Sequence, residues 1–209
     1  MSFLCANNMT GGYGNTDILS QCSIEVAKGE IVVIVGPNGA GKSSAMKAIF
    51  GMLNLRQGNI LLDEFDISNL SPQQRVKQGM GFVPQNQNVF TTMTVNENLE
   101  MGAYIRNDDY IKTMEQVFKL FPILYEKRNQ LAGELSGGQR QQVAVGRALM
   151  TNPSVLMLDE PTAGVSPRVM DELFERILEI RKNNVAILMV EQNARQALAI
   201  ADRGYVLVN

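Results

Sequence analysis

Three short runs of apolar residues, many of them β-branched, stand out along the chain. They occupy residues 31–35, 155–158 and 186–190. Continuous apolar runs of this length predict strands that are buried on both faces, as in parallel sheets. Residues 58–63 predict another strand. Residues 3–30 carry short strand-like pieces with a turn at Gly11-Gly12-Tyr13-Gly14.

Helical signals lie between these runs. Helices are predicted over residues 43–50, from Ser71-Pro72 onward, over residues 111–121 and from Ser166-Pro167 onward. Strands that alternate with helices predict an α/β fold with a mostly parallel sheet flanked by helices. Residues 91–150 have helical signals only. We therefore expect one domain, residues 1–209, in which residues 1–90 and 151–209 form the α/β core and 91–150 a helical insert.

A glycine-rich loop joins the first buried strand to the helix 43–50. Its sequence GPNGAGKS fits the P-loop pattern G-x-x-x-x-G-K-[ST]. Glycines let backbone N–H groups turn toward a phosphate, and the helix N-terminus adds its dipole. An ordinary glycine-rich turn is the alternative. The pattern favours a P-loop NTPase whose nucleotide contacts are Gly36, Asn38, Gly39, Ala40, Gly41, Lys42, Ser43 and Ser44.

Two adjacent carboxylates, Asp159 and Glu160, directly follow the apolar run 155–158. Ligands of open α/β sheets bind at the carboxyl ends of strands. We assign Asp159, together with the Ser43 hydroxyl, to Mg²⁺ and Glu160 to the attacking water as general base. The alternative is a solvated acidic strand end.

A second anion-binding device is predicted at residues 135–141, with the sequence LSGGQRQ. Ser136 and two glycines precede a helix whose free N–H groups favour negative charge. Taken alone, this is a capped helix. Because one chain needs only one such site, we expect Ser136, Gly137, Gly138 and Gln139 to serve the nucleotide of another subunit.

Composition changes this picture little. The net charge is −2 and there is no basic block, which argues against a nucleic-acid partner. No apolar run approaches the ~20 residues that a membrane helix needs, and we see no signal-peptide pattern. The two cysteines lack metal-type spacing and are expected to be reduced thiols. The chain has no histidine.

The P-loop, the LSGGQ string and the Asp159-Glu160 pair together resemble the ATP-binding cassette (ABC) transporter ATPases, and the resemblance covers nearly all of the chain. The family carries an upstream aromatic residue that stacks on adenine, and Tyr13 matches it. Gln85, in the string GFVPQ, matches the family glutamine that reaches Mg²⁺ and senses the membrane partner.

The resemblance implies cofactors and partners. ATP and Mg²⁺ would bind between two such subunits, each a copy of this chain or a related ATPase. Integral-membrane permease subunits would hold the dimer at the cytoplasmic face of the inner membrane. A solute-binding protein would take part indirectly.

Two positions depart from the usual family pattern. Gln192 stands where most members have a histidine that reaches the γ-phosphate, and Ser166 stands where an aspartate ends the loop after Glu160. An amide can donate a hydrogen bond but does not titrate. Both departures resemble the LivF-type ATPases of branched-chain amino acid importers, as do the string VEQNARQA and the later ADRGYVL. We assign Glu160 and Gln192 as catalytic residues.

Several alternatives stay open. Related urea and amide importers share much of this pattern, and a non-transport ABC ATPase acting on ribosomes or DNA is another reading. The guanine motif N-K-x-D of GTPases does not occur, and Glu160 argues against a cassette that binds without hydrolysis. Residues 205–209 read as a strand entering a hairpin, so we expect a truncated C-terminal end.

Overall fold

Two sheets form the framework of the computed structural model, which describes residues 2–14 and 16–208. The antiparallel sheet has the order β2-β1-β4-β5, with β1 Ser2–Tyr13, β2 Thr16–Ala27, β4 Leu55–Leu62 and β5 Phe65–Asp66. The other sheet has the order β6-β7-β8-β3-β9, with β6 Met80–Val83, β7 Val155–Asp159, β8 Ala186–Val190, β3 Ile31–Val35 and β9 Arg203–Val206. Its paired strands all run parallel.

The helices connect and cover these sheets. They are α1 Lys42–Phe50, α2 Pro72–Lys77, α3 Val95–Gly102, α4 Ile111–Leu120, α5 Pro122–Glu126, the 3₁₀ turn η1 Ala132–Glu134, α6 Gly137–Leu149, α7 Pro167–Arg181 and α8 Ala194–Ile200. Among the described residues, no helix combines the length and apolar character needed to cross a membrane.

The parallel sheet separates two hydrophobic cores, since successive side chains of a strand point to opposite faces. In β3, Val32 and Ile34 pack in the core that contains α1 and the antiparallel sheet. Ile31 and Val33 pack in the other core, against α6 and α7. This explains why the strand is apolar at every position: all five of its residues are buried.

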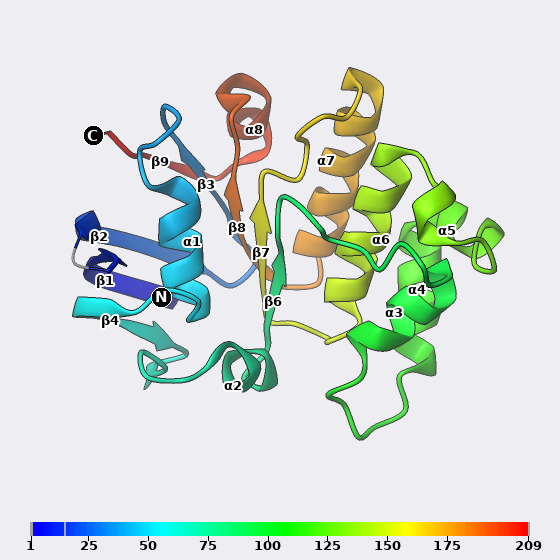
Figure 1. Cartoon of the computed structure of the whole chain (residues 1–209), viewed down its shortest axis with the longest axis horizontal. Coiled ribbons are helices and arrows are strands. Elements are labelled where there is room, and N and C mark those ends of the chain that lie inside the picture. Colours follow the sequence, from blue (N-terminus) through cyan, green and yellow to red (C-terminus); the bar gives the residue numbers. More distant parts are fainter. Residues whose placement is uncertain (1, 15, 209) are drawn as a thin grey trace.

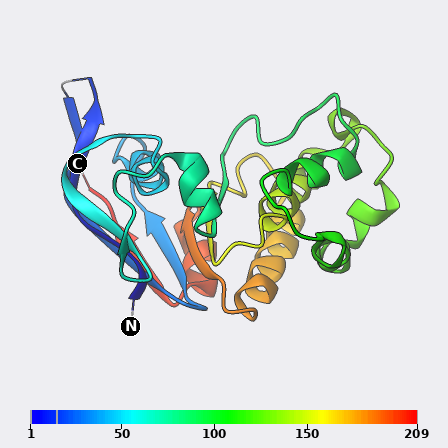
Figure 2. The ribbon, with the colours of Figure 1, turned by 90° about the horizontal axis from the view of Figure 1, so that it is seen from below.

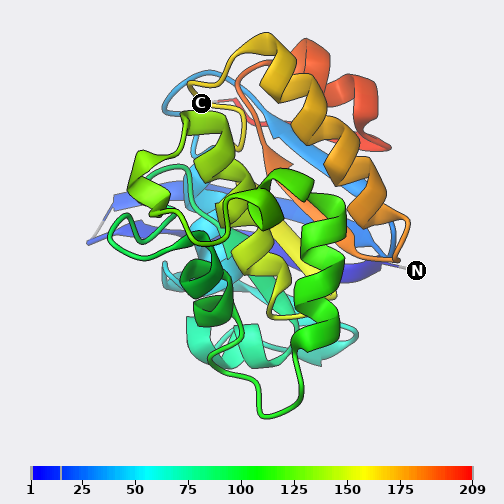
Figure 3. The same cartoon turned by 90° about the vertical axis from the view of Figure 1, so that its right-hand side faces the viewer.

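The layers are visible in Figure 1, where α1 lies between the antiparallel strands on the left and the parallel sheet, while α6 and α7 cover the opposite face. Helices α3, α4 and α5 lie beyond α6, on the side away from the sheets (Figure 2). Seen from that side, these helices stand in front of the sheets (Figure 3). The predicted α/β fold with an N-terminal antiparallel part and a helical insert is confirmed.

The predicted turn at residues 11–14 is wrong, and the strands on either side are longer than the short pieces that the sequence predicts. Gly11, Gly12 and Tyr13 belong to the 12-residue strand β1, and β2 is equally long. The two glycines let neighbouring backbone come close. A Cβ on Gly11 would lie 2.8 Å from the Asn54 carbonyl oxygen, and a Cβ on Gly12 would lie 2.0 Å from the Thr16 carbonyl oxygen. Of these glycines only Gly14, with φ of 57°, has the left-handed conformation of a turn.

Other boundaries also shift. The predicted strand 58–63 begins earlier, at Leu55. Pro122 does not only follow α4 but also opens α5 as its first residue. The final strand begins at Arg203 and ends at Val206, in parallel pairing with β3, whereas Asn209 lies outside the described residues.

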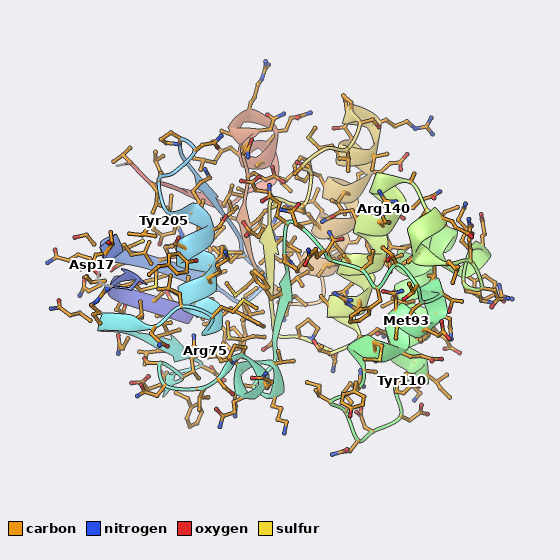
Figure 4. All side chains as sticks on the ribbon, in the orientation of Figure 1. Asp17, Arg75, Met93, Tyr110, Arg140 and Tyr205 are labelled. Atoms are coloured by element: carbon orange, nitrogen blue, oxygen red, sulfur yellow. The ribbon has the colours of Figure 1, made fainter. Side chains whose placement is uncertain are left out.

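The C-terminus of α1 is anchored by a buried arginine. Arg75, only 2% exposed, donates from Nη1 to the carbonyl oxygens of Ala48 and Ile49 at 3.1 and 2.6 Å. Its other nitrogens bond to the carbonyls of Ser68 and Leu70. A cation at a helix C-terminus is favoured by the helix dipole. In Figure 4, Arg75 lies near the end of α1 that is opposite the P-loop.

Candidate active site

The P-loop forms the turn between β3 and α1. Gly39 and Gly41 have φ values of 88° and 87°, a left-handed conformation that side-chain-bearing residues rarely adopt. Lys42 is buried, and its Nζ donates to the carbonyl oxygens of Gly36 and Pro37 at 2.9 and 3.0 Å. The lysine side chain therefore folds back over the loop, and its ammonium group lies beside the carbonyls at the start of the loop.

The start of α1 leaves several backbone donors free. Ala45 is the first helical residue whose N–H bonds to a preceding carbonyl, that of Gly41, at 2.8 Å. Within the described residues, the N–H groups of Lys42, Ser43 and Ser44 have no backbone acceptor. Free N–H groups at a helix N-terminus beside a lysine form a cradle for a phosphate.

Ser43 and Asp159 meet across the two sides of the site. The Ser43 hydroxyl donates to Asp159 Oδ1 at 3.0 Å, although 116 positions separate the two residues. Asp159 is 4% exposed, and this burial raises the pKa of its carboxyl above the usual range, against the effect of the Ser43 hydrogen bond. A cation bound here would favour the ionised carboxylate.

The oxygen donors fit Mg²⁺. Hydroxyl and carboxylate oxygens are the ligands that Mg²⁺ prefers, and it usually binds through one or two carboxylates plus substrate phosphates. Among residues 2–14 and 16–208, no group of three or more His, Cys, Asp or Glu side chains could hold a metal ion. The two oxygens that meet here, those of Ser43 and Asp159, suit an ion that also binds a phosphate.

Glu160 receives two amide donors on one oxygen. Gln85 Nε2 donates to Glu160 Oε2 at 2.6 Å and Gln192 Nε2 donates to the same atom at 2.7 Å. Gln85 follows β6, Glu160 follows β7 and Gln192 follows β8, so the carboxyl ends of three adjacent strands bring them together. The geometry leaves Oε1 as the second acceptor of the carboxylate. The catalytic roles of Glu160 and Gln192 stay predictions.

A second buried carboxylate, which belongs to none of the sequence motifs, lies beside this cluster. Glu191 is 2% exposed, and its Oε1 accepts hydrogen bonds from the N–H and the hydroxyl of Thr162 at 3.1 and 2.9 Å. Burial raises the pKa of the Glu191 carboxyl, and the Thr162 hydrogen bonds oppose this. Only the run of apolar residues before Glu191, which predicts a strand end here, hinted at its place.

The segment after Gln85 is fastened to the helical insert. Asn88 Nδ2 donates to Gln141 Oε1 at 2.7 Å, and the guanidinium of Arg147 lies 4.7 Å from the ring centre of Phe90. The fully buried Asn98 accepts from the Phe90 N–H at 2.8 Å and donates to the Phe90 carbonyl at 2.9 Å. Gln85, at one end of this short segment, thus contacts Glu160, and Phe90, at the other end, is held by Asn98 of α3.

The LSGGQ string is not brought to the P-loop. Ser136 caps α6 in a reciprocal pair with Gln139: its hydroxyl accepts from the Gln139 N–H at 3.3 Å, and its own N–H donates to Gln139 Oε1 at 3.1 Å. Helix α6 packs in the core on one face of the parallel sheet and α1 in the core on the other. Arg140, in the first turns of α6, lies far across the molecule from α1 in Figure 4.

Tyr13 ends β1 and is 52% exposed. The hairpin that carries it reaches the P-loop, because a Cβ at Gly41 would lie 3.3 Å from Ile18 Cγ2. Its stacking on adenine stays a prediction.

Comparisons with known proteins agree on one family. Residues 19–163 match the family model described as ABC transporter. The chain is 42% identical to the high-affinity branched-chain amino acid transport ATP-binding protein BraG of Pseudomonas aeruginosa, over 94% of this chain and 85% of that protein. It is 40% identical to a probable branched-chain amino acid transport ATP-binding protein, LivF, of Archaeoglobus fulgidus, over 96% and 86%.

A solved structure shows the same fold. The ADP conformation of an ATP-binding cassette from an ABC transporter superimposes with a TM-score of 0.88 at 32% identity, over 99% of this chain and 87% of that one.

Proposed function

This chain belongs to the ABC transporter family, and on that premise we propose that it is the ATP-hydrolysing subunit of an importer for branched-chain or other hydrophobic amino acids. The observation that carries the proposal is the edge of the parallel sheet, where Ser43 bonds to Asp159 while Gln85 and Gln192 both bond to Glu160. A phosphate cradle, oxygen donors for a cation and a carboxylate base are the parts that ATP hydrolysis requires.

Each residue has a proposed task in the reaction. The free N–H groups at the start of α1 and Lys42 bind the phosphates of ATP, and Tyr13 stacks on the adenine ring. Glu160 accepts the proton of the attacking water, a task that an amide cannot perform. Ser43, Asp159 and Gln85 would hold Mg²⁺, which neutralises charge on the phosphates when bound.

We propose that two such subunits form the complete site. Gly137 supports this, because a Cβ added there would meet nothing within 4 Å among the described residues. Nothing inside the described chain therefore explains a glycine at this position, whereas close approach of a nucleotide from another subunit does. Since α1 and α6 lie on opposite faces of one sheet, the two anion-binding helix starts suit two different nucleotides.

We infer that residues 91–134 of the helical subdomain, together with Gln85, face integral-membrane permease subunits. The segment 85–90 supports this, since it joins Gln85 in the site to the helices through Asn98 and Gln141. The subdomain also exposes apolar side chains, among them Tyr104, 80% exposed, and Met101, 40% exposed. The protein would then act at the cytoplasmic face of the inner membrane, with a solute-binding protein delivering the substrate.

The amino acid class rests on the names of the relatives, and uptake tests it. A strain that lacks the gene for this chain should lose uptake of labelled leucine, isoleucine and valine, with lysine uptake as the control. The wild-type gene should restore uptake and a Lys42→Ala gene should not. Unchanged uptake of all three branched-chain amino acids would reject the substrate class and leave the ATPase proposal standing.

A further inference from the structure

Three consecutive residues, the last of β8 and the two that follow it, hold the turn that carries Glu160. The Val190 carbonyl accepts from the Glu160 N–H at 3.0 Å, and Gln192 Nε2 donates to the Glu160 side chain at 2.7 Å. Between them, Glu191 Oε1 accepts both the N–H and the hydroxyl of Thr162. The turn is therefore fixed on both sides of Pro161.

The turn needs such support because its backbone is strained. Glu160 has φ of 49°, a left-handed conformation that costs a residue with a side chain roughly 1–3 kcal/mol. Residues in this conformation persist only where their surroundings hold them. A hydrogen bond from the Ala163 N–H to the Glu160 carbonyl, at 3.1 Å, closes the turn from inside, and the strand end at 190–192 holds it from outside.

Glu191 is also tied to the strand that leads into the P-loop. Its backbone N–H donates to the carbonyl of Ile34 in β3 at 3.2 Å. Its side chain and that of Thr162 are almost fully buried, at 2% and 6% exposure. A carboxylate placed here with two donors on one oxygen has limited freedom to move.

Resting on the proposed function, we propose that Glu191 is a positioning residue for hydrolysis: it fixes Thr162 and so keeps Glu160 in the conformation that aims its carboxylate at the reacting water. Glu191 acts through Thr162 and does not contact the nucleotide. A displacement of the base of about 1 Å can cost about 10²-fold in rate, so loss of this contact should reduce kcat and leave ATP binding intact.

Phosphate release by the assembled transporter tests this. Glu191→Ala should lower kcat about tenfold or more, with the KM for ATP changed little. Glu191→Gln, which keeps an acceptor oxygen for both Thr162 donors, should restore most of the turnover. Thr162→Val should lower kcat and Thr162→Ser should not. Adding Thr162→Val to Glu191→Ala should cause no further loss, because Glu191→Ala already removes the acceptor of the Thr162 hydroxyl.

The outcomes separate the inference from the function beneath it. A Glu191→Ala protein with wild-type kcat, or a Glu191→Gln protein as impaired as Glu191→Ala, would overturn the positioning role. If Glu191→Ala does not fold, the comparison of Thr162→Val with Thr162→Ser decides. A wild-type protein without ATPase activity, or a Glu160→Gln protein that keeps it, would instead reject the proposed function.

Discussion

The carboxylate of Glu160 is arranged asymmetrically. Both amides, from Gln85 and Gln192, donate to Oε2, and Oε1 accepts no hydrogen bond from the described residues. Two donors on one oxygen fix the orientation of the carboxylate and leave the other oxygen available to a water molecule. Gln192 thus contacts Glu160 directly, and its predicted contact with the γ-phosphate stays a prediction.

Lys42 is expected to dominate phosphate affinity. Lys42→Ala removes the only mobile cation of the loop, and charge-assisted hydrogen bonds contribute about 1.5–3 kcal/mol each. The affinity for Mg·ATP, measured by calorimetry, should fall tenfold or more, which corresponds to about 1.4 kcal/mol. Lys47→Ala, which removes the same charge from the last turn of α1, is the control. Equal affinities of the Lys42→Ala and wild-type proteins would contradict the account.

Single residues were predictable where a local motif carries the chemistry. Ser43 and Asp159 were paired from the sequence because a P-loop and a strand-end carboxylate meet at one sheet edge, and their side chains are 3.0 Å apart. Glu191 had no such signal. Its role depends on Thr162, which lies 29 positions earlier and becomes its neighbour only through β7 and β8 pairing.

The start of α6 presents two glycines in different surroundings. A Cβ at Gly138 would lie 2.4 Å from Val169 Cγ1 of α7, so packing between the two helices requires that glycine. Gly137 meets nothing among the described residues. Gly138 thus serves the fold of the chain, whereas Gly137 is free to face another molecule.

This difference predicts opposite outcomes for two neighbouring substitutions. Gly138→Ala should destabilise the protein by about 1–3 kcal/mol through overpacking, which lowers the melting temperature by roughly 2–4 °C per kcal/mol. Gly137→Ala should keep the melting temperature and the ATP affinity of the monomer, yet weaken ATP-dependent dimerisation. Light scattering in a Glu160→Gln background measures the dimer. If Gly137→Ala dimerises with ATP like its parent, the cross-subunit role is wrong.

Helices and strands were predictable where one periodicity governs a segment. The runs 31–35 and 186–190 are strands at those bounds, because burial on both faces demands apolar residues throughout. Long strands β1 and β2 were not predicted, since irregular register and close-packed glycines interrupt their alternation. The predicted helix 111–121 is α4, in which Ile111 is 60% exposed at the first position and Val117 is 2% exposed.

A short segment connects Gln85, at the edge of the parallel sheet, to the helical insert. Gln85 bonds to Glu160, and only a few residues later Phe90 is held by Asn98. Five residues of extended chain span at most about 17–18 Å, so a large shift of the helices would pull Gln85 away from the base. A partner bound to the helical insert could in this way influence hydrolysis.

Crosslinking tests where that partner binds. In a Cys5→Ser/Cys22→Ser background, a single cysteine at Tyr104 should crosslink to a permease subunit, because Tyr104 lies exposed on the helical insert beside Met101. Arg168→Cys, equally exposed at the start of α7, is the matched control. Crosslinks from Arg168→Cys alone would place the permease on the other side and reject residues 91–134 as the docking surface.

The rate of phosphate release by the assembled transporter, compared between Glu160→Gln and Gln192→Ala, tests the central claim most directly. Loss of the general base should lower turnover by about 10²–10⁴ while ATP is still bound. Loss of one amide donor to Glu160 removes about 1.5–3 kcal/mol, so Gln192→Ala should cost only about tenfold to a hundredfold. A Glu160→Gln protein that turns over like wild type, beside an inactive Gln192→Ala protein, would contradict the account.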